Sequence, residues 1–208
     1  GIAPEECTVA IQGFGKVGSY VARFLFEEGV RIAGVTDISG GAHDPSGIDI
    51  EALDSHCKAA GGVAGFTARK ITNEALFRLK CDYLIPAASG HVITGDNANA
   101  IGAGCIVEAA NMPVTYDAMK ILYGKGVTIL PDSYANAGGV IASNLEYRQA
   151  LGGLKFTREQ TLVEVRDRLD NAYTACEPLL AKGRTLTEAT TDVALMRVHE
   201  TMVNRSLL

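Results

Sequence analysis

Three glycines, Gly13, Gly15 and Gly18, form a GxGxxG pattern that follows an apolar, β-branched run and opens a helical pattern. In this setting the first glycine allows a tight turn from strand to helix. The second lets a phosphate approach the backbone, and the third lets the helix pack closely on the strand. The N–H groups at the start of such a helix bind an anion. The pattern therefore predicts a site for the pyrophosphate of a dinucleotide.

An acidic residue, Asp37, follows the next apolar run, about 20 residues beyond Gly18, where a carboxylate accepts hydrogen bonds from the hydroxyls of the adenosine ribose. The same carboxylate repels a 2′-phosphate, and residues 38–42 contain no Lys or Arg to neutralise one. The spacing favours NAD as the cofactor, and NADP remains the alternative. On the competing interpretation, the glycines are ordinary turn residues and Asp37 is a solvated acid.

Short apolar runs alternate with helical patterns along the first 130 residues. Strands are predicted at Cys7 to Gln12, Arg31 to Thr36, Asp82 to Ile85, Cys105 to Glu108 and Val127 to Leu130. Helices are predicted at 16–28, 49–60, 72–79 and 116–123. The runs are almost entirely apolar, as expected for strands buried on both faces. The alternation predicts an α/β fold of the Rossmann type, with a doubly wound, mostly parallel sheet covered by helices on both faces.

Helix 16–28 carries apolar residues at spacings of three and four, namely Val17, Tyr20, Val21, Phe24 and Leu25. This periodicity predicts that one face of the helix packs on the sheet. Gly29 is expected to end the helix.

Beyond residue 140 the pattern is helical to the end of the chain. Thr157 with Gln160, and Thr185 with Glu188, match the capping box that begins a helix. Two long helices are therefore predicted, about 158–182 and 186–205. Because no linker divides the sequence, we expect a single dinucleotide-binding domain over residues 1–208, with a core of about 7–150 and C-terminal helices at about 157–205.

Composition excludes several classes of function. The chain has 208 residues and a formal net charge of −5, which argues against a nucleic-acid partner. No apolar run approaches the length of a membrane span, so no membrane partner is expected. The five cysteines form no CxxC pair and no complete disulfide framework, which favours a reducing, intracellular compartment. The four histidines lack the spacing of metal ligands, so no metal site is predicted.

Five segments, in order along the chain, resemble the cofactor domain of the glutamate, leucine, phenylalanine and valine dehydrogenase family. They are residues 9–25 (VAIQGFGKVGSYVARFL), 44–53 (DPSGIDIEAL), 81–88 (CDYLIPAA), 107–115 (VEAANMPVT) and 129–143 (ILPDSYANAGGVIAS). Within the family the chain is most similar to NAD-dependent glutamate dehydrogenases, in which the fourth segment reads EAAN. Met112 departs from the pattern, because Gly or His is more usual at that position.

The resemblance implies a role for each matching residue. The residues expected to bind the pyrophosphate are Gly13, Phe14, Gly15, Lys16, Val17 and Gly18. Asp37 and Ile38 would lie at the adenosine ribose, and Ala87 and Ala88 along the cofactor near the adenosine. Asn111 would contact the nicotinamide ribose, and Asn136, in a loop of residues 131–139 that follows a strand, would hold the carboxamide. Ser143 matches the position that contacts the substrate side chain, where a hydroxyl favours glutamate over apolar amino acids. Alternatively, Asn136 and Ser143 simply cap the helix that follows.

The resemblance implies the cofactor domain of an enzyme that interconverts L-glutamate with 2-oxoglutarate and ammonia. In the family, a lysine and an aspartate of a preceding substrate domain handle the protons. No matching motif occurs here, so we predict no catalytic residue in this chain, a substrate domain outside it, and little activity of the chain alone. The parent enzyme is expected to be a cytoplasmic homo-oligomer, with the mitochondrial matrix as the alternative compartment. Two other functions remain open: the cofactor domain of a leucine or other apolar amino acid dehydrogenase, and a stand-alone NAD-binding regulatory module.

Overall fold

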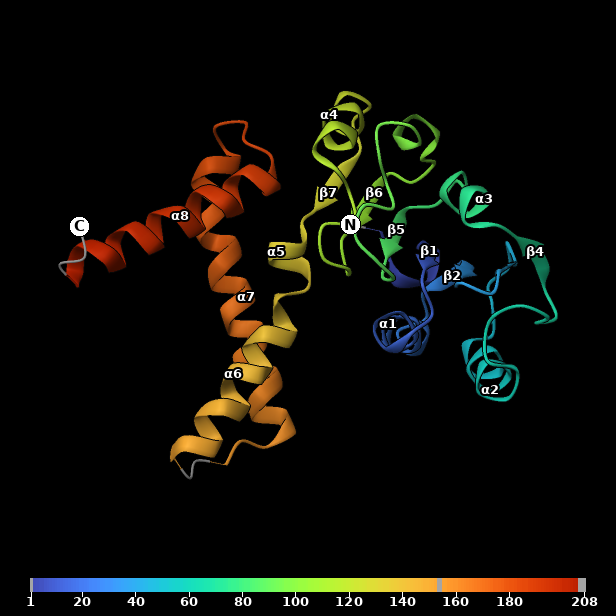
Figure 1. Ribbon diagram of the computed structural model, residues 1–208, viewed down its shortest axis with the longest axis horizontal. Helices are drawn as coiled ribbons and strands as arrows, with labels where there is room; N and C mark the ends of the chain where they lie inside the picture. The colour runs from blue at the N-terminus through green and yellow to red at the C-terminus, as the bar shows by residue number, and fades with distance from the viewer. Residues whose placement is uncertain (1, 153–154, 206–208) are drawn as a thin grey trace. The chain divides into compact units, whose positions relative to one another are not determined.

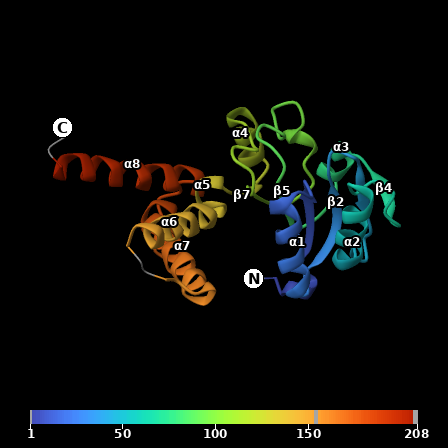
Figure 2. The ribbon, with the colours of Figure 1, turned by 60° about the horizontal axis from the view of Figure 1, so that its bottom comes forward.

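A computed structural model of the chain describes residues 2–152 and 155–205. The chain divides into two compact units, Gly1–Ile129 and Leu130–Leu208. Figure 1 shows the sheet of the first unit and the helices of the second, and Figure 2 shows the same elements from another side. The organisation of the chain as one domain stays a prediction.

The first unit is built on a seven-stranded sheet of order β4-β3-β2-β1-β5-β6-β7. Its strands are β1 (Thr8–Gln12), β2 (Arg31–Thr36), β3 (Gly41–His43), β4 (Arg69–Ile71), β5 (Tyr83–Pro86), β6 (Cys105–Val107) and β7 (Thr128–Leu130). β1 pairs in parallel with both β2 and β5, and β5 pairs in parallel with β6. This mostly parallel sheet confirms the predicted α/β fold class, and the five predicted strands are present within one or two residues of their expected ends.

Two short strands were not predicted. β3 and β4 pair antiparallel and extend the sheet beyond β2. Each has three residues, and β4 is largely exposed and includes two basic residues, Arg69 and Lys70. A strand of three residues is too short to form an apolar run, and β4 is polar as well, which explains why the sequence pattern did not indicate these strands.

Helices cover the sheet on both faces (Figure 1). The helical elements of the first unit are η1 (Pro4–Glu6), α1 (Lys16–Glu27), α2 (Ile50–Ala60), α3 (Asn73–Phe77), η2 (Ala98–Ala100) and α4 (Tyr116–Gly124). Alternate residues of β1 serve the two cores: Val9 and Ile11 pack with α1 and α2, whereas Ala10 packs with α3, η2 and α4. The period of two along a strand therefore divides the unit into two apolar layers.

Helix α1 packs on the sheet through Gly18 and Ala22 together with Val21 and Leu25, so the predicted apolar face is confirmed in part. Gly18 and Ala22 are buried, but Val17, Tyr20 and Phe24 are 48%, 52% and 51% exposed. The periodicity identified the helix and two of its packed residues, but Val17, Tyr20 and Phe24 of the predicted face are exposed.

The second unit is helical, with α5 (Asp132–Ala135), α6 (Ala137–Gly152), α7 (Arg158–Leu180) and α8 (Leu186–Asn204). Most of the predicted loop at 131–139 is therefore helical, because α5 begins directly after Pro131 and Gly138 and Gly139 lie inside α6. Both predicted capping boxes are present, at Thr157 and at Thr185. They fix the beginnings of α7 and α8 as expected.

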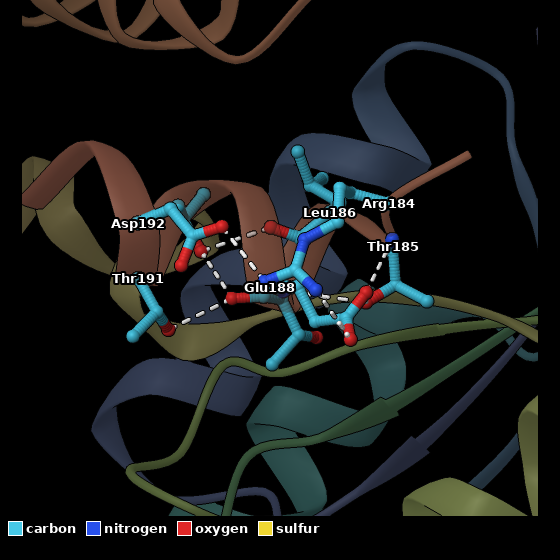
Figure 3. Close-up of polar contacts among 8 residues, drawn as sticks. Arg184, Thr185, Leu186, Glu188, Thr191 and Asp192 are labelled. Atoms are coloured by element: carbon cyan, nitrogen blue, oxygen red, sulfur yellow. Dashed lines mark hydrogen bonds and ion pairs between the residues drawn. The ribbon is translucent and has the colours of Figure 1, made fainter. Parts of the chain in front are cut away.

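An ion-paired turn joins α7 to α8. The Arg184 guanidinium lies 2.7 Å from Asp192 and 3.3 Å from Glu188 (Figure 3). Glu188 also accepts a hydrogen bond from the Thr185 N–H as part of the capping box. Beneath this turn lies a small core of Cys176, Ala189 and Val193. Within residues 2–152 and 155–205, no helix is both long and apolar enough to cross a membrane.

Candidate dinucleotide-binding site

The turn between β1 and α1 requires glycine at two positions for internal reasons. Gly13 adopts φ +99°, and its N–H donates to the Thr36 carbonyl over 2.7 Å. A Cβ added at Gly13 would lie 2.7 Å from the Ala88 backbone nitrogen, and one at Gly18 would lie 1.9 Å from the Gly13 carbonyl oxygen. These two glycines therefore allow the strand, the helix and the loop after β5 to pack together.

Gly15 has a different environment. Its φ is −80°, which any residue adopts, and a Cβ there would meet nothing within 4 Å. Gly15 is also the N-cap of α1, and no described side chain caps this helix. The first turn of α1 therefore has no side-chain cap, and the space beside Gly15 is open. This arrangement fits a pyrophosphate, which binds to the N–H groups of an uncapped helix start.

The other residues of the turn differ in exposure. Phe14 is partly buried and packs against the core beneath α1. Lys16 and Val17 are exposed at the start of the helix. Phe14 thus packs the turn against the core, and Lys16 contributes a positive charge at the start of α1.

Asp37 directly follows β2 and is half-buried. Its Oδ1 accepts from the Ser39 N–H at 2.7 Å, the Ser39 hydroxyl at 2.6 Å and the Gly40 N–H at 3.2 Å. Its Oδ2 accepts from the Val63 N–H at 2.9 Å. A carboxylate oxygen accepts more than one hydrogen bond, so Oδ2 retains capacity for a ribose hydroxyl. In the described part of the chain no Lys or Arg forms an ion pair with Asp37, which is consistent with selection against a 2′-phosphate.

Sequence reasoning missed the residues that hold Asp37 in place. The Ser39 hydroxyl also accepts from the Ala64 N–H at 2.9 Å and so ties the turn after β2 to the loop after α2. A Cβ at Gly62 would lie 2.4 Å from the Ser39 hydroxyl and 3.0 Å from Asp37 Oδ2. Asp-x-Ser is a turn signal visible in the sequence, but nothing local indicates that this turn contacts residues 62–64.

The loops after β5 and β6 meet at the same edge of the sheet. The Ala87 N–H donates to the Gln12 carbonyl at 2.7 Å, and the N–H groups of Ala109 and Ala110 donate to the Pro86 carbonyl. Ala88 and Asn111 are exposed at this edge, as is Ile38 after β2. The structure therefore brings every predicted site residue of the first unit to the carboxyl edge of the parallel strands, where ligands bind in open α/β sheets.

Met112 adopts φ +45°, a left-handed conformation that glycine tolerates better. Its carbonyl accepts from the His91 N–H at 2.8 Å, and His91 itself has φ +58°. Met112 thus keeps the backbone conformation that glycine would adopt at this position, and a residue with a side chain does so at some cost in backbone strain.

Asn136 and Ser143 belong to the second unit. Asn136 is the C-cap of α5 and is partly buried, and Ser143 is exposed in the first half of α6. Asn136 directly precedes α6, and Ser143 lies within it. The roles of these two residues at the nicotinamide and the substrate stay predictions.

The cysteines are free thiols, and two histidine rings contact backbone carbonyls. All five cysteines are free, and burial raises the pKa of Cys81 to about 12 and that of Cys105 to about 11. The His43 and His56 rings contact the carbonyls of residues 33 and 64. The described residues contain no group of three or more His, Cys, Asp or Glu that could hold a metal ion.

Comparison with known proteins decides the family. Residues 2–206, almost the whole chain, match the family described as Glutamate/Leucine/Phenylalanine/Valine dehydrogenase. The chain belongs to this family. Among its members, the NAD-specific glutamate dehydrogenase of Staphylococcus aureus is 41% identical over 169 residues, and glutamate dehydrogenase A2 of Halobacterium salinarum is 45% identical over 170. Each match covers 81% of this chain and 41% of the relative, so the chain spans less than half the length of these enzymes.

Solved structures of the family share the fold. The hetero-hexameric glutamate dehydrogenase of Thermus thermophilus, in a leucine-bound form, is 29% identical with a TM-score of 0.87, covering 99% of this chain and 49% of that one. The L-tryptophan dehydrogenase of Nostoc punctiforme is 25% identical with a TM-score of 0.68, covering 93% of this chain and 53% of that one. These similarities confirm the Rossmann-type fold predicted for this chain.

Proposed function

We propose that the chain is the cofactor domain of an NAD-dependent glutamate dehydrogenase. The observation that carries the proposal is the uncapped start of α1 beside Gly15, where nothing lies within 4 Å of a Cβ position. Asp37 is half-buried and forms no ion pair with a Lys or Arg of residues 2–152 and 155–205, which supports NAD over NADP. The identity to the NAD-specific relative supports both the cofactor and the substrate.

On this proposal the residues of the first unit bind and orient the dinucleotide. The N–H groups at the start of α1 receive the pyrophosphate, and Asp37 accepts hydrogen bonds from the adenosine ribose. Asn111 contacts the nicotinamide ribose. For Asn136, which belongs to the second unit, the proposed role is to hold the carboxamide so that one face of the ring is presented to the substrate. Bound NAD supplies the hydride acceptor for oxidation of the amino acid at Cα.

The substrate assignment rests on Ser143. A hydroxyl at this position can donate a hydrogen bond to the distal carboxylate of glutamate, and an apolar amino acid would leave it unpaired. The proton-handling lysine and aspartate are proposed to lie outside these 208 residues, in a substrate domain of a homo-oligomeric, cytoplasmic parent enzyme. The reaction is the reversible oxidative deamination of L-glutamate to 2-oxoglutarate and ammonia.

Calorimetric titration of the chain with NAD and with NADP tests the cofactor assignment. We expect NAD to bind with a Kd between about 1 μM and 1 mM, a range that corresponds to about 8 to 4 kcal/mol, and NADP to bind more weakly. Equal affinity for NAD and NADP would contradict the role of Asp37. Binding of neither dinucleotide would contradict the whole site.

The substrate assignment is tested in the full-length enzyme by replacing Ser143 with Val. Loss of kcat/KM for glutamate with a gain for leucine is expected. A variant with an unchanged ratio of the two would favour an apolar amino acid dehydrogenase or a role for Ser143 in the helix alone.

A further inference from the structure

A cavity of about 450 Å³ lies at the amino end of β2, at the edge of the sheet opposite the glycine turn. Its lining comes from η1, the end of α1, the first residues of β2 and the loop that precedes α2. The six residues of β2 span about 20 Å at the rise of a strand, and Asp37 follows its far end. The cavity is therefore separate from the proposed cofactor site, and its size is typical of a site for a small molecule.

Two side chains of opposite charge line this cavity, and each lies against a glycine. A Cβ added at Gly47 would lie 3.2 Å from Arg31 Cγ, and one added at Gly29 would lie 3.7 Å from Glu5 Cγ. Both glycines adopt a positive φ, +108° at Gly47 and +84° at Gly29. The absence of side chains at these two turns leaves room for Arg31 beside the loop before α2 and for Glu5 beside the end of α1.

Arg31 and Glu5 do not pair with each other across the cavity. In the described part of the chain neither side chain forms an ion pair, and the Arg31 Nε is buried without a hydrogen-bond partner. Hydrogen bonds from Thr8 lower the pKa of Asp82, and the charge of Arg31 adds to this effect, but the Asp82 carboxylate forms no ion pair with Arg31. Buried charges are normally paired. A bound carboxylate would supply the missing partner of this partly buried guanidinium through two parallel N–H bonds.

The lining near Gly29 is electronegative. Gly29 directly follows Glu28, the C-cap of α1, where the last carbonyl groups give the helix a partial negative charge. Glu5 lies against this glycine, and Asp49, the N-cap of α2, adds a second carboxylate to the lining. The lining thus carries one positive and two negative charges. A doubly negative phosphate is disfavoured by this balance, whereas a ligand with both a carboxylate and an ammonium group complements it.

Apolar side chains complete the lining. Phe26, Ile32 and Ile48 are among them, and Phe26 is 37% exposed although it is a large apolar residue. We propose that this cavity binds an α-amino acid with an apolar side chain, as a second ligand site apart from the cofactor site. Arg31 binds the carboxylate of the ligand, Glu5 binds its ammonium group, and Phe26 contacts its side chain.

The test is a titration of the ¹⁵N-labelled 208-residue chain with L-norleucine, followed by nuclear magnetic resonance. We expect the amide signals of residues 29–32 and 46–49 to shift with a single saturating Kd of about 1 mM or tighter, both without NAD and in its presence. Absence of saturable shifts in these two segments would overturn the proposal. Shifts confined to residues 14–18, or loss of norleucine binding when NAD is added, would also overturn it, because the ligand would then occupy the cofactor site.

Two analogues that each lack one charge test the two contacts in the unaltered chain. Pentylamine lacks the carboxylate and should bind at least about tenfold more weakly than norleucine, since it leaves the guanidinium unpaired. Hexanoate lacks the ammonium group and should bind about two- to fivefold more weakly, because the carboxylate of Glu5 is exposed to solvent. Equal affinity for norleucine and either analogue would overturn the corresponding contact and with it the proposed ligand class.

Matched variants assign these effects to residues. Arg31→Met keeps the unbranched stem, and Glu5→Gln keeps the shape of the side chain; we expect them to raise the Kd of norleucine by at least about tenfold and by about two- to fivefold. Arg69→Met on β4 and Glu74→Gln on α3 remove the same charges outside the cavity and should leave the Kd unchanged. An unchanged Kd in a folded Arg31→Met chain would overturn the proposal, and the analogues test the same contact if this variant does not fold. Failure of NAD to bind would overturn the proposed function and leave this site standing.

Discussion

Replacing Gly15 and Gly18 with alanine should separate ligand binding from folding. A methyl group at Gly15 meets no protein atom within 4 Å, and φ −80° suits alanine. Replacing an N-cap glycine with alanine costs up to about 1 kcal/mol, and the reduced entropy of the unfolded chain offsets about 0.4–1 kcal/mol of this. The free energy of unfolding of Gly15→Ala should therefore stay within about 1 kcal/mol of the original.

Gly18→Ala serves as the matched control with the opposite outcome. Its Cβ would lie 1.9 Å from the Gly13 carbonyl oxygen, so α1 must move away from the turn. Overpacking of this kind costs about 1–3 kcal/mol or more, and each kcal/mol lowers the Tm of a chain of this size by about 2–4 °C. Scanning calorimetry should show this loss for Gly18→Ala and little change for Gly15→Ala.

The effect on NAD binding should be large for Gly15→Ala despite its stability. The methyl group occupies the space through which the pyrophosphate approaches the backbone. Loss of one hydrogen bond to a charged group is worth about 1.5–3 kcal/mol, which raises the Kd by about 10- to 150-fold. Unchanged NAD affinity in a folded Gly15→Ala chain would refute the reasoning.

Three further predictions concern the pKa values and helix caps. Thr8 donates its N–H and its hydroxyl to the Asp82 carboxylate, and these hydrogen bonds lower the pKa of that carboxyl. Their contribution to stability is therefore present above the unfolded pKa, near 3.9, and is lost in more acid solution. The Tm deficit of Thr8→Val should thus be larger at pH 7 than at pH 3, and equal deficits would contradict the prediction. Thr185→Ala should cost about 1 kcal/mol by removing the cap of α8, seen as a lower Tm that Thr185→Ser restores. Burial raises the pKa of the Cys57 thiol from 9.0 to about 11. Its thiolate fraction at pH 8 is therefore on the order of 100-fold lower than in the unfolded chain. Alkylation of Cys57 by iodoacetamide, followed by mass spectrometry, should be correspondingly slow until urea unfolds the chain.

The sequence was most informative where local chemistry and geometry coincide. The buried strands were predicted because both of their faces are apolar, and the two capping boxes because each is a local pairing of Thr with a side chain three residues away. The glycine turn was predicted for the same reason, since its three residues act within one strand-to-helix connection.

Features that depend on distant contacts could not be read from the sequence. The residues that hold Asp37 and Ser39 include Val63 and Ala64 of the loop after α2, about 25 residues away. Hydrophobic periodicity found Val21 and Leu25 on the packed side of α1 but does not describe the burial of Gly18, which follows from its close approach to the Gly13 carbonyl. The helical conformation of residues 132–135 was missed because a short stretch with Pro131 before it has the composition of a loop.

The central claim is that the backbone N–H groups at the start of α1 bind the pyrophosphate of NAD. Nuclear magnetic resonance of the ¹⁵N-labelled chain during titration with NAD observes these groups directly. The account predicts that the amide signals of residues 14–18 shift with a single saturating Kd, together with those of residues 37–40. Saturable binding of NAD that leaves the signals of residues 14–18 in place would contradict it.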